Sequence, residues 1–262
     1  MNVLIYCIFE YPHPSGLESL KGLGDEPLSL IETDGLMAAV SRIVPPEVTP
    51  DLKRLLQYQK IIEWFHNNGA IIPMRYGCLV AEESEVIRIL KKHGEEYKRL
   101  LRELEGCEEM GIRILGSEYR ANQLKSEIEN KPSSHPGQAY LASRKVLYDQ
   151  EESLNKENRA LSEAYREVFA GLFVKCKEEG PSILPTRRAV DNNRLLSLYF
   201  LVPKPLLNPF RRAFQRMPSK EGRKILLSGP WPPYNFVHSP KRHNEAFEFF
   251  RDYHDQPGQN QG

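Results

Sequence analysis

The sequence predicts an α+β protein of two domains, each a mostly antiparallel sheet with helices on one face. Short apolar runs of strand length alternate with longer stretches in which apolar residues recur at helical spacing. Clusters of Gly, Pro and Asn separate these runs and mark turns. A chain of 262 residues is too long for one small domain and suits two of ordinary size.

Three strands are expected first. Residues 3–9 form an unbroken apolar run, which predicts a buried strand. Two further apolar runs, 28–31 and 36–44, flank Thr33-Asp34-Gly35. Asp-Gly between two strand-like runs predicts a β-hairpin.

Two helices follow. Thr49-Pro50-Asp51 predicts the start of the first helix, with Thr49 as its N-cap, and Asn67-Asn68-Gly69 predicts its end. Ser84 is the expected N-cap of the second helix. Each helix carries an apolar face, formed by Leu52, Leu55, Leu56, Ile62 and Phe65 in the first and by Val86, Leu90, Tyr97, Leu101 and Leu104 in the second.

The first domain is completed by two more strands. Residues 70–80 predict a strand that is interrupted at Pro73 and Gly77, and residues 110–115 predict a strand that closes the sheet. This order of elements is near to the ferredoxin-like pattern with an extra strand. The first domain is therefore expected over 1–120.

A Pro-, Ser- and Gly-rich stretch predicts a linker over 121–137. Residues 138–178 then form one long helical pattern, with apolar residues seven apart at Tyr140, Leu147, Leu154, Leu161 and Val168. The intervening positions are polar in the middle of this stretch, so the pattern predicts a coiled-coil-like arm that folds back or projects, or else a simple surface helix. Its last third is expected in a core, through Val168, Phe169, Leu172, Phe173 and Cys176.

The second domain is expected over 138–240, with a C-terminal tail over 241–262. Runs 182–190 and 195–202 flank Asp191-Asn192-Asn193 and predict a second hairpin, and residues 207–217 predict a helix. This domain is a second ferredoxin-like variant that carries the long helical arm.

The stretch from Lys224 to Val237 begins as a strand that we expect to be buried on both faces. Its prolines cannot lie in a central strand, so the strand should end near Pro230. The stiff segment after it carries Trp231, Tyr234 and Phe236. Two interpretations stay open: the rings cover the end of a core, or they form a docking surface for another protein.

The composition excludes several classes of function. A formal net charge of +1 does not favour nucleic acid or an anionic membrane. Four scattered cysteines without a Cys-x-x-Cys motif argue against a metal site or a disulfide framework and suit the reducing cytoplasm. The apolar start of the chain lacks a basic region and is too short for a signal peptide.

The sequence carries no recognisable catalytic, cofactor-binding or metal-binding motif, and each histidine is expected to be a solvated surface residue. Arg75 is the charge of most interest, because it stands in an otherwise apolar segment. Such a charge must be paired or reach solvent. It serves either in a structural ion pair or in binding a partner.

Five segments together resemble the gas vesicle protein F/L family (GvpF/GvpL). They are I-I-P-M-R-Y-G at 71–77, L-E-G at 104–106, G-I-R-I-L at 111–115, P-G-Q-A-Y-L-A-S-R-K at 136–145 and S-G-P-W-P-P-Y-N-F at 228–236. They occur in the family's order over most of the chain, and the last is by far the most specific. The chain departs from the family at Tyr76, where Phe is common, and in its tail after Val237.

The resemblance implies a non-enzymatic accessory protein of gas vesicles, the protein shells that give prokaryotes buoyancy. Such a protein is expected to bind the small hydrophobic major shell protein (GvpA), and other accessory proteins, and to assist vesicle nucleation or assembly. Arg75, Trp231, Tyr234 and Phe236 are the candidate residues for partner binding or for structure.

Two other functions are weighed against this one. A ferredoxin-like sheet can bind RNA, although the near-neutral charge and the missing aromatic-basic strand motif count against it. A small-molecule enzyme on an α+β scaffold rests on fold analogy alone.

Overall fold

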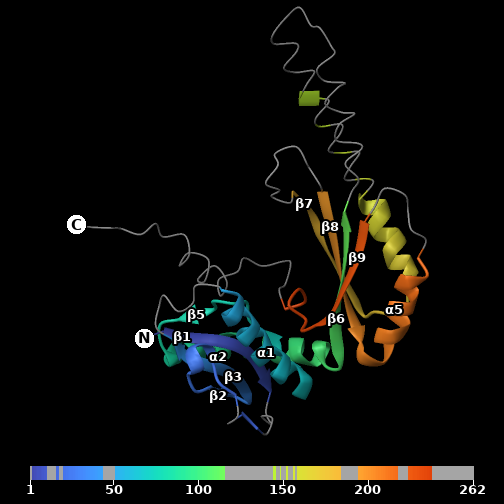
Figure 1. Cartoon of the computed structure of the whole chain (residues 1–262). Coiled ribbons are helices and arrows are strands. Elements are labelled where there is room, and N and C mark those ends of the chain that lie inside the picture. Colours follow the sequence, from blue (N-terminus) through green and yellow to red (C-terminus); the bar gives the residue numbers. More distant parts are fainter. Residues whose placement is uncertain are drawn as a thin grey trace, which may run out of the picture. The chain divides into compact units, whose positions relative to one another are not determined.

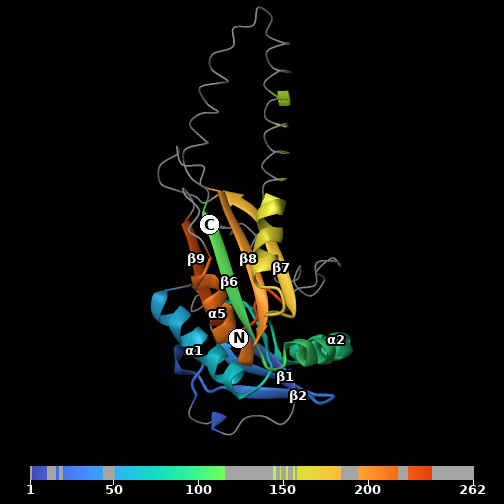
Figure 2. The same cartoon turned by 90° about the vertical axis from the view of Figure 1, so that its right-hand side faces the viewer.

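A computed structural model describes residues 2–10, 16–17, 20–43, 51–115, 144–145, 148, 152, 156, 158–183, 194–217 and 224–237. The chain forms two compact units, Met1–Glu108 with Trp231–Gly262 and Glu109–Pro230 (Figures 1 and 2). The chain therefore leaves the first unit after Glu108 and returns to it at Trp231. The linker expected over 121–137 lies outside the described residues, so the domain bounds expected from the sequence remain a prediction.

The first unit is built on a five-stranded sheet with β1 (Asn2–Glu10) inside it. The strand order is β2-β3-β1-β4, and β5 also pairs with β1. β1 is antiparallel to β3 (Leu36–Ile43) and to the two short strands β4 (Ile72–Pro73) and β5 (Leu79–Val80). The buried first strand and the interrupted strand over 70–80 are both confirmed.

The hairpin predicted around Asp34-Gly35 is also confirmed. β2 (Ser29–Thr33) pairs antiparallel with β3, and Thr33 lies opposite Leu36. The φ angles of Asp34 and Gly35 are 53° and 79°. Two successive left-handed residues are what a two-residue type I′ turn requires, and Asp-Gly tolerates them.

Both helices of the first unit form, but their N-caps differ from the prediction. α1 spans Leu52–Asn68, and its cap is Asp51, whose carboxylate accepts a hydrogen bond from the Arg54 N–H at 2.8 Å. α2 spans Glu83–Leu104 with Glu82 before it, and the Ser84 hydroxyl donates to the Glu82 carboxylate. Thr49 and Ser84 were therefore the wrong caps, since several polar residues near each start can satisfy the first N–H groups.

The apolar face of α1 is only half buried. Tyr58, Ile61, Ile62 and Phe65 lie in the first core. Leu52, Leu55 and Leu56, which the sequence places on the same apolar face, are 73%, 41% and 50% exposed, so the core covers only part of that face. The pattern of a helix shows which residues share a face, but it does not show where the covering sheet ends. In α2 the expected Val86, Leu90, Leu101 and Leu104 are buried.

The second unit holds a four-stranded sheet in the order β7-β8-β6-β9. Its strands are β6 (Cys107–Leu115), β7 (Lys175–Ile183), β8 (Arg194–Pro203) and β9 (Lys224–Trp231). The sequence placed 110–115 in the first sheet, whereas β6 lies between β8 and β9 in the second. Met110, Ile112 and Ile114 belong to the second core, and an apolar alternation does not reveal which sheet it will join.

The long helical pattern ends earlier than predicted. Residues 158–168 are helical, and β7 begins at Lys175 and pairs antiparallel with β8. The expected strand 182–190 therefore overlaps β7 by two residues. Phe169 is buried as expected, whereas Val168 is exposed. Most of the expected arm before residue 158 lies outside the described residues.

β9 is an edge strand, so the prediction that it is buried on both faces is wrong: Leu226 is exposed. Pro230 lies within this strand, which an edge position permits.

Three phenylalanine rings hold the second unit together. η3 (Lys204–Leu206) leads into α5 (Leu207–Gln215), which places Phe210 against the sheet as the sequence predicts. The rings of Phe169 and Phe210 stack at a centroid distance of 4.1 Å, and both lie within 5.4 Å of Phe200 on β8. The helical segment 158–168 and α5 thus pack on one face of the sheet (Figure 1). None of the described helices is long and apolar enough to cross a membrane.

Replacing Phe169 by Ala should destabilise the protein by about 3–5 kcal/mol, because it removes a fully buried ring from this stack. The neighbouring exposed Val168→Ala is the matched control and should cost well under about 1 kcal/mol. Urea unfolding followed by circular dichroism measures both. Equal midpoints for the two variants would contradict this packing.

The thiol of Cys78 makes stability depend on alkaline pH. Burial raises its pKa from 9.0 to about 12, so the unfolded chain releases this proton at lower pH than the folded chain does. The stabilisation is fully present below about pH 9 and is lost as the pH rises towards 12, by about 1.4 kcal/mol per pH unit. Burial also raises the pKa of Cys7 and of Tyr58, which act in the same direction.

The free energy of unfolding should decrease between about pH 8 and about pH 10.5, and this decrease should be about 2 kcal/mol smaller in Cys78→Ala than in the unchanged protein. Equal losses in the two proteins would show that this thiol is not held protonated by the fold.

Candidate functional site

The first two turns of α1 present an apolar surface to solvent. Leu52, Leu55 and Leu56, called here the α1 patch, stand at i, i+3 and i+4 and so lie on one side of the helix. Asp51 holds the start of this helix in place, because it caps the Arg54 N–H and also pairs with the Arg54 guanidinium at 3.5 Å. The patch is therefore presented on an ordered helix start.

Tyr58 ties α1 to the loop that carries Arg75. Its hydroxyl donates to the Met74 carbonyl at 2.9 Å, with the carbonyls of Arg75 and Ile5 at 3.2 and 3.4 Å. Burial raises the pKa of Tyr58 well above its ordinary value, so the hydroxyl keeps its proton and remains a donor. The main chain at Arg75 is thus held beside α1 by Tyr58, which follows Leu55 by three residues, about one helical turn.

The side chain of Arg75 reaches solvent. It is exposed, and it forms no ion pair with any residue that the structure describes. The sequence left two interpretations of Arg75 open, a structural ion pair and a role in partner binding. For the first, Arg75 has no acidic partner in the described part of the chain. A role in partner binding remains a proposal.

Tyr76, next to Arg75, packs into the same region. Its ring stands edge-on to that of Tyr58, with the centroids 5.3 Å apart. Its hydroxyl is buried and has no hydrogen-bond partner among the described residues. Burial raises the pKa of Tyr76, and the nearby Arg54 guanidinium opposes that rise. The sequence marked Tyr76 only as a departure from the family's usual Phe, and it did not single out Tyr58, for which the helical spacing with Leu55 and Ile62 was the available signal.

The segment after β9 divides into covered and accessible residues. Pro232 and Pro233 are buried, and two turn hydrogen bonds, Tyr234 N–H to the Pro232 carbonyl and Phe236 N–H to the Pro233 carbonyl, close it at 2.8 and 3.1 Å. Tyr234 packs against the first core, and Phe236 is half-buried. Trp231 is 40% exposed. Tyr234 therefore contributes to packing in the first unit, while Trp231 is accessible to a partner.

His66 is not the solvated residue that the sequence predicts. It is 6% exposed, and its Nε2 lies 2.7 Å from a carboxylate oxygen of Glu108. Within the described residues no group of three or more His, Cys, Asp and Glu side chains could hold a metal ion.

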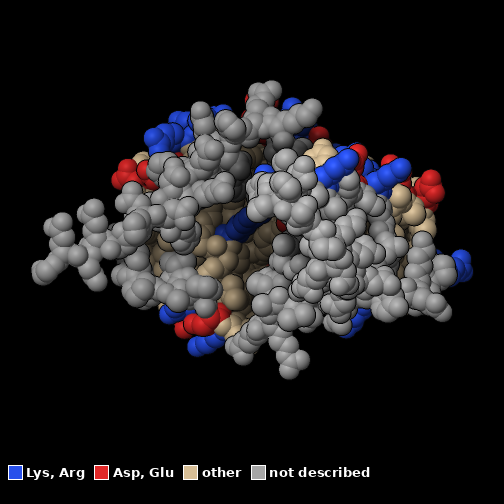
Figure 3. All heavy atoms as spheres, turned by 90° about the horizontal axis from the view of Figure 1, so that it is seen from above, with Lys and Arg blue, Asp and Glu red and all other residues tan. Residues whose placement is uncertain are grey.

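On the face shown in Figure 3, the coloured basic and acidic side chains lie next to one another.

Comparison with known proteins shows relatives along nearly the whole chain. The family model "Gas vesicle synthesis protein GvpL/GvpF" matches residues 2–238. Gas vesicle protein F of Streptomyces sp. (strain CB03234) is 26% identical, over 90% of this chain and 100% of that protein. Gas vesicle protein L1 of Halobacterium salinarum is 20% identical, over 89% of each.

Two solved structures share the fold. The crystal structure of the gas vesicle protein GvpF from Anabaena sp. PCC7120 matches with a TM-score of 0.65 at 16% identity, over 93% of this chain and 99% of that one. The GvpF structure from Microcystis aeruginosa matches with a TM-score of 0.66 at 18% identity, over 91% and 99%. Because the family model spans residues 2–238 of the 262, the chain belongs to the gas vesicle synthesis protein GvpL/GvpF family.

Proposed function

We propose that this protein is a non-enzymatic accessory protein that binds the major gas vesicle shell protein (GvpA) and assists nucleation or assembly of the vesicle. Family membership supports a role with gas vesicles. The observation that carries the binding proposal is the α1 patch, three leucines exposed on one side of an ordered helix. The protein would act in the cytoplasm and at the gas vesicle.

The chemistry of the patch suits a hydrophobic client. Covering an exposed leucine side chain completely gains about 1.5–3 kcal/mol, so three partly exposed leucines supply a useful share of a binding free energy. An apolar shell subunit needs its surface covered before it enters the vesicle wall, and a helix face that lacks a partner offers that cover. Arg75, whose loop Tyr58 holds beside α1, would pair with a carboxylate at the edge of the contact.

Two finer features of the fold belong to this proposal. The second unit runs β6, helical residues 158–168, β7, β8, α5 and β9, and its sheet order is β7-β8-β6-β9. This order of elements supports a ferredoxin-like unit. Residues 144–145, 148, 152 and 156 are also helical, which supports a long arm before residue 158 that could reach a further subunit.

RNA binding is not favoured as the alternative. A sheet that binds RNA stacks bases on exposed aromatic residues of its strands. In the second sheet Phe200 is fully buried, and the Tyr199 hydroxyl donates to the Glu179 carboxylate at 2.7 Å. An acidic partner beside the half-buried ring is unfavourable for a phosphate backbone.

Replacing Leu52 and Leu56 together by Glu should lower co-purification of the shell protein by at least about tenfold, because two charges would enter an apolar contact. Lys53→Glu on the same turn is the control for added negative charge and should bind nearly as well as the unchanged protein. Pull-down of the shell protein from cells that express both proteins measures the effect. No capture by the unchanged protein would overturn the binding proposal, whereas equal capture by all variants would overturn only the α1 patch as its site.

Trp231→Ala and Tyr234→Ala should differ in their effect on the thermal stability of the protein. Tyr234→Ala should lower the thermal midpoint because its ring packs on the first core, and Trp231→Ala should leave the midpoint nearly unchanged because the indole is accessible. Thermal unfolding and the same pull-down separate the two roles. If Trp231→Ala unfolds the protein and Tyr234→Ala does not, the assignment of these two rings is wrong.

A further inference from the structure

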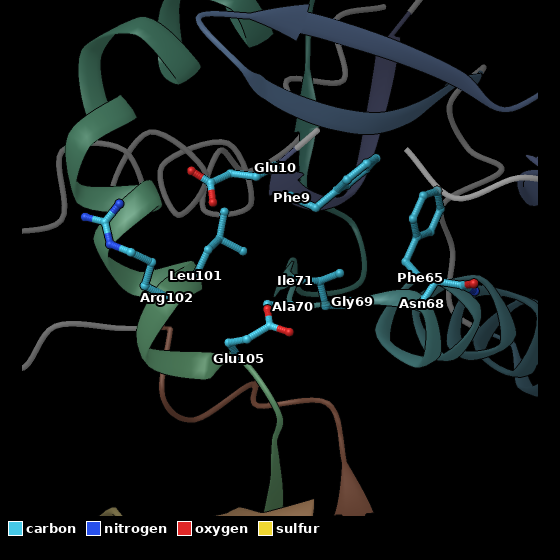
Figure 4. A pocket seen from close by; sticks show the side chains of 10 residues that line it. All are labelled: Phe9, Glu10, Phe65, Asn68, Gly69, Ala70, Ile71, Leu101, Arg102 and Glu105. Atoms are coloured by element: carbon cyan, nitrogen blue, oxygen red, sulfur yellow. The ribbon is translucent and has the colours of Figure 1, made fainter. Parts of the chain in front are cut away.

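A pocket of about 420 Å³ lies in the first unit, away from the α1 patch (Figure 4). Three elements end around it: β1 contributes its last two residues, α1 its last turn and Gly69, and α2 its last turn and Glu105. Neither the family match nor the proposed function assigns a role to it.

The inner wall of the pocket is apolar and ordered. Phe9, Phe65, Ile71 and Leu101 line it, and each is at least nine-tenths buried. The rings of Phe9 and Phe65 are 5.1 Å apart, so they support one another in the wall. A wall of this kind can receive an aliphatic stem or the face of a planar group.

The rim of the pocket is charged and has an excess of negative charge. Glu10, Arg102 and Glu105 stand there, with a formal sum of −1. Figure 4 shows all three on the side of the pocket where α2 ends. All three are exposed, and none forms an ion pair with another described residue.

The ends of both helices add to this negative potential. The last four carbonyl groups of a helix lack intrahelical partners and carry partial negative charge. α1 ends at Asn68 and α2 at Leu104, and both ends border the pocket. The Asn68 side-chain amide donates to the Trp64 carbonyl, one turn back, at 2.7 Å, so it leaves these last carbonyls unsatisfied and both helix ends favour a cation.

We propose that this pocket receives an arginine side chain of a protein partner. Its aliphatic stem would lie along Phe9 and Ile71, and its guanidinium would face the carboxylates of Glu10 and Glu105. Arginine fits better than lysine, because the planar guanidinium is more weakly hydrated and its fork of N–H groups can serve two carboxylates. The pocket is a second contact, and it does not depend on the identity of the partner at the α1 patch.

Arg102 sets how strongly the pocket attracts such a side chain. Its guanidinium stands on the same rim without an ion-pair partner among the described residues, so it repels an incoming cation. Removal of this charge should therefore tighten binding, whereas removal of the two carboxylates should weaken it. A merely apolar pocket would respond to neither change.

The test is an NMR titration of the full-length protein with N-acetyl-L-arginine amide and with its neutral isostere N-acetyl-L-citrulline amide. The arginine probe should shift the amide signals of Gly69, Ala70 and Leu101 with a Kd in the range of about 1–20 mM, and the citrulline probe should bind at least about fivefold more weakly. Glu10→Gln with Glu105→Gln should weaken the arginine probe by about five- to tenfold, and Arg102→Gln should tighten it by about two- to fivefold.

Glu32→Gln, at an exposed carboxylate on β2 that does not line the pocket, is the matched control and should change neither probe. The proposal is overturned if the arginine probe causes no shift up to about 50 mM, a limit that corresponds to negligible affinity. It is equally overturned if the citrulline probe binds as well as the arginine probe, or if the double glutamine variant binds the arginine probe unchanged. The NMR titrations do not involve the shell protein, so their outcome is independent of the pull-down that tests the α1 patch.

Discussion

The first unit depends on the pairing of β1 along both of its edges. β3 pairs with one edge, and β4 and β5 pair with the other. The run from Val3 to Phe9 is buried throughout, so both faces of this strand are covered as well as both edges. The same pairing positions two of the surfaces proposed for binding, because β4 leads into the Arg75 loop and the end of β1 places Phe9 and Glu10 at the pocket.

α1 connects these two surfaces. Its middle and last turns are anchored by Tyr58, Ile62 and Phe65, and its first two turns extend past the core with leucines exposed. The α1 patch lies at its start and the pocket at its end, and a helix of 17 residues is roughly 25 Å long. The two proposed contacts therefore lie at opposite ends of one helix.

The second unit follows a different constraint, the stack of Phe169, Phe200 and Phe210. These rings come from a turn after the helical segment, from β8 and from α5, so one cluster joins the helical segment and α5 to one face of the sheet.

The start of β6 approaches β9 closely. A Cβ on Gly229 would stand 2.6 Å from the Glu109 carbonyl oxygen, and one on Gly111 would stand 2.7 Å from the Ser228 hydroxyl. Close backbone approach and a φ of 105° explain the glycine at position 229, whereas at position 111 it is the Ser228 side chain that occupies the space of a Cβ.

The sequence by itself determined the features that neighbouring residues control. The Asp34-Gly35 turn, the end of α1 at Gly69, the buried face of α2 and the family motifs could all be identified from short segments. Only the tertiary structure decided that β6 joins the second sheet, that the α1 patch is exposed, that His66 meets Glu108 and that Glu10 and Glu105 share a pocket with Arg102. Those features depend on contacts between residues far apart in the chain, and periodicity shows that a face is apolar without showing what will cover it.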